Sequence, residues 1–169
     1  MNFTSVLKVA SILIIFLFLC SCQNTNPKAT KDIEKTIPKQ EMAYDSIQAK
    51  AFGADEYGMK KYVIAFLKKG PNRDRSKEES AALQAAHMEN IGRLAEAGKL
   101  VLAGPFLDDG DLRGIYIFDV ETVEEAQKLT QTDPAIQAGS LVMELKPWYG
   151  SAAVMGINAV HGTLAKNPM

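Results

Sequence analysis

Two side chains of this sequence have the types needed for proton transfer, His87 and Asp133. His87 shares an apolar stripe with Leu83 and Ile91, at spacings that place all three on one face of a helix. If Asp133 met the imidazole, its carboxylate would fix the tautomer of the ring and stabilise the protonated form. The ring could then act as a general base near neutral pH. The sequence therefore offers a candidate catalytic pair, provided that the fold brings its members together.

Each member of this pair also has an ordinary structural explanation. A histidine on an apolar stripe can be a core-edge residue whose ring nitrogens bind backbone groups or water. An aspartate directly before a proline, as Asp133 is, commonly caps a turn or a short helix. Both explanations stay open beside the catalytic one.

Other kinds of reactive site are not indicated. The sequence contains no glycine-rich phosphate loop and no G-x-S-x-G motif. Its second histidine, His161, has no carboxylate at metal-ligand spacing, so we predict neither a metal site nor a cofactor. Arg73, Arg75 and Arg93 are expected to be solvated rather than to bind a ligand. With 19 basic and 20 acidic residues and no basic stripe interleaved with aromatic residues, the chain is not expected to bind nucleic acid.

A second candidate element is the segment formed by Gly104, Pro105 and Phe106, which ends an apolar strand. Its structural explanation is a strand end, because the residue before a proline is held extended and glycine tolerates crowding. Its functional explanation is a pocket wall beside His87, with Phe106 giving an apolar face to a flat ligand. The pattern favours neither.

The N-terminus has the pattern of an export signal. Lys8 precedes an apolar run over residues 9–19, which is too short to span a membrane and typical of a signal peptide. Leu19, Cys20, Ser21 and Cys22 then resemble the lipobox of bacterial lipoproteins. The resemblance implies a signal peptide of residues 1–21, a lipid on Cys22, and a location in the bacterial cell envelope, on the periplasmic side or the surface. An uncleaved signal anchor is the alternative. Processing would leave no free thiol.

The rest of the chain divides by composition. Residues 22–57 are polar, mixed in charge and interrupted by Pro27 and Pro38, which predicts a tether with one helical piece near residues 41–51. Residues 58–150 have the patterning of a single folded domain, and residues 151–169 are expected to form a C-terminal helical extension.

Six elements are expected within the domain. Periodicity predicts strands at 61–68, 100–106, 112–120 and 141–146, and helices at 77–97 and 122–130. The order β-α-β-β-α-β predicts an α+β, ferredoxin-like fold: a four-stranded antiparallel sheet with both helices on one face. In that topology the end of the second helix lies beside the first half of the first. His87 and Asp133 can therefore meet.

The strands are apolar on both sides, which two helices on one face cannot cover. In strand 61–68, for example, Tyr62, Ile64 and Phe66 point away from Val63 and Ala65, and all five are apolar or aromatic. The uncovered face is most simply buried against the same face of a second copy. We therefore predict a homodimer formed through the sheet faces.

The C-terminal extension is predicted to form a helix with one apolar face that packs on another part of the protein. Its residues Ala153, Ile157, Val160 and Leu164 fall at helical spacing. This stripe is expected to face either the body of the domain or the partner copy.

A family resemblance covers about residues 60–148. It rests on the histidine, the segment after it, the Asp-Pro pair and the end of the last strand, at these positions: His87, Arg93, Leu94, Gly98, Leu100, Ala103, Gly104, Pro105, Phe106, Gly114, Glu125, Ala126, Asp133, Pro134, Ala138, Gly139, Pro147 and Trp148. This pattern resembles the YCII-related (YciI-like) family. The resemblance implies a dimeric α+β barrel, and it implies that His87 and Asp133 correspond to a pair proposed as the family's active site. Some relatives look like enzymes of aromatic degradation, including a dehydrochlorinase.

Two functions of different classes follow. The first is a lyase or isomerase, needing no cofactor, in which the His87–Asp133 pair transfers a proton on a small cyclic or aromatic compound. The second is a membrane-tethered module that binds a small molecule without turnover. A structural dimer partner is a third. The signal, tether and extension are additions to the family pattern, so a relative's substrate need not carry over.

Overall fold

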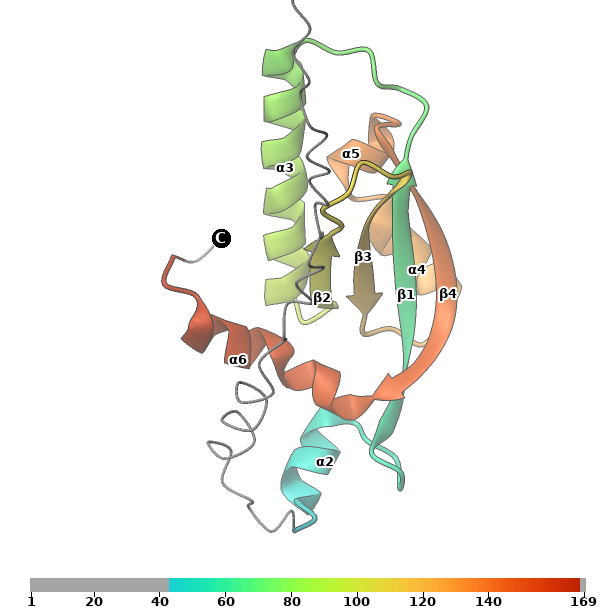
Figure 1. Ribbon diagram of the computed structural model, residues 1–169. Helices are drawn as coiled ribbons and strands as arrows, with labels where there is room; N and C mark the ends of the chain where they lie inside the picture. Colours follow the sequence, from blue (N-terminus) through green and yellow to red (C-terminus); the bar gives the residue numbers. More distant parts are fainter. Residues whose placement is uncertain (1–42, 168–169) are drawn as a thin grey trace, which may run out of the picture. The chain divides into compact units, whose positions relative to one another are not determined.

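Four strands rich in β-branched and aromatic residues form the sheet at the centre of this protein (Figure 1). The computed structural model describes residues 43–167. The predicted signal peptide, Cys22 and the tether as far as residue 42 lie outside the described residues. The elements are α2 (Ser46–Phe52), β1 (Met59–Lys69), α3 (Lys77–Glu96), β2 (Leu100–Pro105), β3 (Leu112–Phe118), α4 (Val123–Thr130), α5 (Pro134–Gln137), β4 (Leu141–Ser151), the 3-10 helix η1 (Ala152–Gly156) and α6 (Ile157–Leu164).

The predicted β-α-β-β-α-β order and the α+β class are confirmed. The strands lie in the order β2-β3-β1-β4, and every neighbouring pair is antiparallel. The prediction that the last strand ends at residue 146 was wrong, since β4 continues through Pro147 and Trp148. Because β4 is an edge strand, one of its sides makes no ladder hydrogen bonds, and a proline is tolerated there.

The long helix α3 is set by clear local signals at both ends. The Ser76 side chain accepts a hydrogen bond from the Glu79 backbone, and the Glu79 carboxylate accepts one from the Ser76 backbone, which completes a capping box. Gly98 follows the helix with a φ of 68°, a conformation that glycine adopts without strain. These signals fix the length of α3 and hence the face on which His87 lies.

A helix, α2, lies within the stretch predicted as a tether, where one helical piece was expected near residues 41–51. Asp45 caps this helix by accepting hydrogen bonds from the backbone of Ile47 and Gln48. The helix packs against η1, where Phe52 contacts Gly156 closely. Residues 46–52 therefore contact the C-terminal part of the chain.

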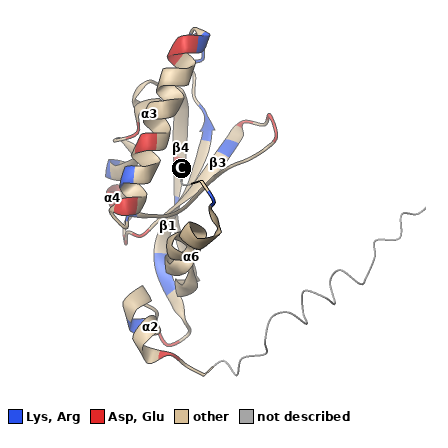
Figure 2. Cartoon of the chain, turned by 90° about the vertical axis from the view of Figure 1, so that its left-hand side faces the viewer, with Lys and Arg blue, Asp and Glu red and all other residues tan. Residues whose placement is uncertain are grey.

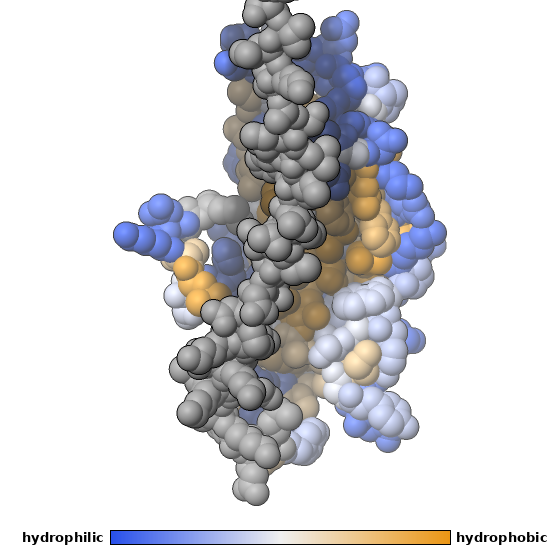
Figure 3. All heavy atoms as spheres, viewed as in Figure 1, coloured by the Kyte–Doolittle hydropathy of each residue, from blue (hydrophilic) through white to orange (hydrophobic). Residues whose placement is uncertain are grey.

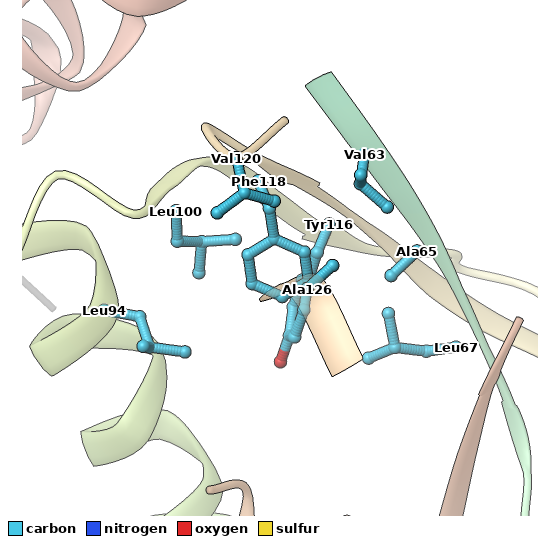
Figure 4. Close-up of a cluster of buried hydrophobic side chains, with 9 residues drawn as sticks. All are labelled: Val63, Ala65, Leu67, Leu94, Leu100, Tyr116, Phe118, Val120 and Ala126. Atoms are coloured by element: carbon cyan, nitrogen blue, oxygen red, sulfur yellow. The ribbon is translucent and has the colours of Figure 1, made fainter. Parts of the chain in front are cut away.

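One face of the sheet carries the main core, which Figure 4 shows. Leu94 from α3 and Ala126 from α4 pack onto the inward side chains of three strands, which are Val63, Ala65, Leu67, Leu100, Tyr116 and Phe118. In Figure 2, α3 and α4 lie together on one side of the strands. Both helices therefore cover the same face, as predicted.

The second face is partly covered by the chain itself. Tyr62, Val101 and Ile117 are buried there beneath Val154 and Met155 of η1. The C-terminal extension therefore buries one part of a face that we expected a second copy to cover alone. Beyond η1, the apolar side chains of Ile64, Phe66, Ile115 and Val142 remain only partly covered, and we call them the open patch. The ion-paired Lys68, Glu144 and Lys146 lie on the same face beside it. Figure 3 shows apolar atoms on this side of the molecule.

The helical stripe predicted in the extension does not face the body of its own chain. Val160 is 58% exposed and Leu164 is 77% exposed, and no residue of α6 is buried. The helix is held instead by a polar contact, in which the Asn158 amide donates to the Leu100 carbonyl (3.0 Å). Among residues 43–167, no helix combines the length and the apolar character needed to cross a membrane.

Candidate functional site

The fold brings His87 and Asp133 together. His87 lies on the inward face of α3 and is 8% exposed, while Asp133 lies between α4 and α5 and is fully buried. The imidazole Nδ1 is 2.8 Å from Oδ2 and 3.0 Å from Oδ1 of Asp133. The contact that the topology allowed is therefore present, formed through the short helix α5, which packs on α3.

Asp133 serves two purposes at once. Its Oδ1 accepts a hydrogen bond from the backbone N–H of Ala135 (2.8 Å) and so caps α5, as an aspartate before a proline often does. Its two oxygens also face the imidazole. Because an ionised carboxylate can only accept, Nδ1 of His87 must be the donor, and in the neutral ring Nε2 then carries the lone pair. The structural and catalytic explanations of Asp133 are thus compatible.

Tyr116 also belongs to the site, although its sequence position predicts only a strand residue. Its hydroxyl oxygen lies 3.3 Å from Nε2 of His87, and the two rings are stacked with centroids 6.3 Å apart. Burial raises the pKa of the Tyr116 phenol, with a smaller contribution from the negative charge of Asp133. The phenol therefore stays neutral and can donate to Nε2. The signal that could have found it was register, because Tyr116 pairs with Ala103, the neighbour of the Gly104 segment.

A polar network fixes the residue before Asp133 onto α3. Asn90 Oδ1 accepts hydrogen bonds from Arg93 Nη2 (2.6 Å) and from the Thr132 hydroxyl (3.0 Å), and Arg93 Nη2 also lies 2.8 Å from that hydroxyl. The sequence predicted that Arg93 would be solvated, but its guanidinium takes part in this network. It helps to hold the 132–133 turn against the helix that carries His87.

A pocket of about 470 Å³ opens beside this pair, within the size range of small-molecule sites. His87 and Tyr116 line it, together with apolar side chains of α3 that include Leu83 and Ile91. Asp133 is not among the lining residues, so it contacts the histidine from behind.

The predicted Gly104 segment contributes only in part to this pocket. Gly104 and Pro105 line it, whereas Phe106 lies outside the lining and is 38% exposed. Gly114 lies on the same wall, where an added Cβ would meet the carbonyl oxygen of Gly104 at 2.6 Å. A glycine at this position therefore allows β2 and β3 to approach closely beneath the pocket.

The lining of this pocket is positively charged, which was not predicted from the sequence. Arg73 and Arg75 from the loop before α3, and Arg113 from β3, all line it. None of its lining residues is an aspartate or glutamate. No cluster of three or more potential metal-binding side chains occurs within residues 43–167.

Known proteins resemble this chain at several levels. The model of the YCII-related domain family matches residues 61–149. The chain is 33% identical to an uncharacterized protein, YjpA, of Bacillus subtilis (strain 168) over 64 residues, which are 38% of this chain and 73% of that protein. Among solved structures it is similar to 5-chloro-2-hydroxyhydroquinone dehydrochlorinase (TftG) from Burkholderia phenoliruptrix AC1100 in complex with 2,5-dihydroxybenzoquinone. That similarity has a TM-score of 0.39 and 23% identity, covering 51% of this chain and 92% of that chain. Because the family model spans more than half of the 169 residues, this chain belongs to the YCII-related domain family.

Proposed function

We propose that this protein is an enzyme that uses His87 as a general base and acid on a small cyclic or aromatic compound, as a lyase or isomerase. The observation that carries the proposal is a buried imidazole whose Nδ1 is held by a carboxylate and whose other edge belongs to the wall of a pocket. Burial excludes the bulk water that would otherwise compete for the ring.

The proposed reaction is a proton transfer in two halves. The Nε2 lone pair of His87 removes a proton from a carbon of the bound compound, and the Asp133 carboxylate stabilises the imidazolium that forms. In an isomerisation, Nε2–H then returns the proton to a different atom. In an elimination, the electrons of the broken C–H bond form the new double bond and expel a leaving group with its own electron pair. The residues that carry this chemistry supply it without a cofactor.

Tyr116 favours a second function, a binding module without turnover. Its hydroxyl lies within hydrogen-bond distance of Nε2 of His87. The lone pair of Nε2 is therefore not free until a ligand displaces this hydroxyl or passes its proton through it. A Tyr–His–Asp chain of this kind could serve only to present a fixed polar edge to a ligand. The two functions differ in whether a bond to hydrogen is broken.

Deuterium exchange separates them. The full chain, purified in non-ionic detergent, is incubated in D₂O with a panel of hydroxylated aromatic compounds, quinones and lactones, and products are followed by mass spectrometry. We expect wild type to exchange or convert at least one compound, and His87→Gln to lower that rate by about 100-fold or more. His161→Gln is the matched control, since this histidine lies exposed on α6. Conversion that survives His87→Gln would remove the enzyme proposal. Binding without exchange would establish the second function.

We also propose that the protein is a homodimer formed through the second face of the sheet. Two apolar surfaces support this: the open patch, and the exposed stripe of α6 that includes Val160 and Leu164. The stripe was expected to pack either on the body of the domain or on the partner copy. In the single chain it does not pack on the body, so the partner copy is the remaining place. Sedimentation at micromolar concentration is expected to give a dimer, and a monomer would contradict the proposal.

The membrane tether is a further proposal, supported by the lipobox resemblance at Cys22. A lipid on this cysteine would place the domain at the bacterial cell envelope. Cys22→Ala is expected to abolish incorporation of labelled palmitate and to release the protein from the membrane fraction. Labelling that persists in this variant would show that Cys22 is not the modified residue.

A further inference from the structure

We propose that Arg73, Arg75 and Arg113 form an anion clamp, so that the ligand of this pocket is an organic anion, a single-ring carboxylate or phenolate. This inference rests on the proposed function, because it assigns the substrate class of the same site. It starts from an imbalance of charge. The whole chain has 19 basic and 20 acidic residues, yet the pocket lining contains these arginines and no carboxylate.

Each guanidinium is fixed by neutral partners. Arg73 Nη1 donates to the Ser140 carbonyl (3.1 Å), Arg75 Nη2 to the Ala138 carbonyl (2.6 Å), and Arg113 Nη1 to the carbonyls of Asp108 (3.0 Å) and Gly110 (3.3 Å). These bonds hold the side chains in place without neutralising them. A guanidinium has five N–H donors in a planar fork, so donors remain for a ligand.

No carboxylate compensates these charges at close range in the part of the chain that the structure describes. Its ion pairs all use lysine or histidine as the cation. The lowered pKa of Glu79 comes mainly from its hydrogen bonds with Ser76 in the capping box, and the charge of Arg75 makes only the smallest contribution. Like charges that converge on one pocket repel one another unless an anion enters. An oxyanion that accepts from two forks would relieve that repulsion and be held in a fixed orientation.

The position of the clamp also orients the ligand. Arg73 and Arg75 lie on the loop that leads into α3, and Arg113 is the second residue of β3. In Figure 2, blue for Lys and Arg marks the part of β3 next to the hairpin loop. His87 lies further along α3, with apolar wall between them that includes Leu83. An anionic group at the arginines would place the ring on this apolar wall and a ring or side-chain carbon near Nε2. The clamp would thus supply the binding energy that positions the reacting C–H bond.

Matched acid and amide pairs test the clamp. Binding of salicylate and gentisate to the full chain in non-ionic detergent is compared by calorimetry with binding of the corresponding amides. We expect wild type to bind the acids at least about tenfold more tightly than the amides, because charge-assisted pairs are stronger than neutral ones. Raising the salt concentration should weaken only the acids.

Single substitutions then locate the effect. Arg113→Gln should weaken acid binding by about tenfold and leave amide binding unchanged, whereas Arg113→Lys should keep part of the preference. Lys128→Gln is the control, since Lys128 lies exposed on α4 and outside the pocket lining. Arg113→Gln also removes the hydrogen bonds to the hairpin carbonyls of Asp108 and Gly110, so unchanged amide binding is needed to show that the pocket is intact.

Several results would overturn the clamp: equal affinity for acids and amides, no response to Arg113→Gln, or no binding of any acid at millimolar concentration. These outcomes are separate from failure of the proposed function. If acids are preferred and deuterium exchange does not depend on His87, the clamp stands and the enzyme proposal fails. If exchange depends on His87 and amides serve as well as acids, the reverse holds.

Discussion

Replacement of Asp133 tests how the carboxylate contributes to the fold and to His87. In Asp133→Asn, the retained Oδ1 can still cap α5 at Ala135, while the new amide nitrogen faces Nδ1 of His87. The imidazole must then change tautomer to accept. A hydrogen bond to a charged group contributes about 1.5–3 kcal/mol and a neutral one about 1 kcal/mol. We therefore expect the Asn variant to lower the free energy of unfolding by about 1 kcal/mol.

Asp133→Ala removes both contacts. Loss of the cap costs about 1 kcal/mol. Loss of the carboxylate costs about 1.5–3 kcal/mol more, because a buried donor on His87 is left without its partner. The expected total is about 2.5–4 kcal/mol. Thr122→Ala is the control, since Thr122 caps α4 through Glu125 and touches no imidazole, and it should cost only about 1 kcal/mol.

Urea unfolding followed by circular dichroism measures these differences. The series should rank wild type above Asn, and Asn well above Ala, with unchanged dependence on denaturant. If Asp133→Asn costs as much as Asp133→Ala, the cap and the imidazole contact are not separable in the way that the structure indicates. If neither variant loses stability, the buried pair contributes nothing and the reasoning is refuted.

Three further predictions concern pH and assembly. Burial raises the pKa of Tyr116, so above about pH 10 the tyrosine ionises in the unfolded chain before it ionises in the folded one. Tyr116 should therefore lower the free energy of unfolding by up to about 1.4 kcal/mol per pH unit in that range. Tyr116→Phe should lose this pH dependence in alkaline unfolding, and a variant with the same pH dependence as wild type would contradict the prediction. Hydrogen bonds from Lys146 and Lys68 lower the pKa of Glu144 to about 2, so its stabilisation, present above its ordinary pKa near 4.5, is lost as pH falls toward 2; Glu144→Gln should unfold less steeply in acid, and high salt should mask the difference because this side chain is exposed to solvent. Phe66→Lys, in the open patch, should convert a sedimenting dimer to a folded monomer, and a dimer that persists would place the interface elsewhere.

The topology was predictable because its signals are local. The capping box at Ser76 and the side-chain cap at Thr122 mark helix starts, and four apolar segments bounded by turn residues give the order from which the antiparallel sheet follows. The meeting of His87 and Asp133 followed from that topology. What the sequence did not show was that the turn between Thr130 and Pro134 is pinned to α3 by Asn90, because that contact depends on a side-chain network.

The charge of the pocket could not be read from the sequence. Arg73 and Arg75 come from the loop after β1 and Arg113 from the start of β3, and the pairing of the end of β1 with the start of β3 brings them to one pocket. The prediction that Phe106 lines the pocket was wrong for the opposite reason, because it relied on closeness in the sequence. It adjoins Pro105 in the chain, but it follows the last residue of β2 and so leaves the wall that Gly104 and Pro105 form.

The state of the His87 ring tests the central claim most directly. Nitrogen-15 NMR of the full chain, labelled at histidine, distinguishes a protonated ring nitrogen from one with a lone pair, and His161→Gln assigns the signals. At mildly alkaline pH the neutral ring is expected to carry its proton on Nδ1 and the lone pair on Nε2, and Asp133→Asn should reverse the two. A ring protonated on Nε2 in wild type would contradict the account, because His87 would then have no base to present to the pocket.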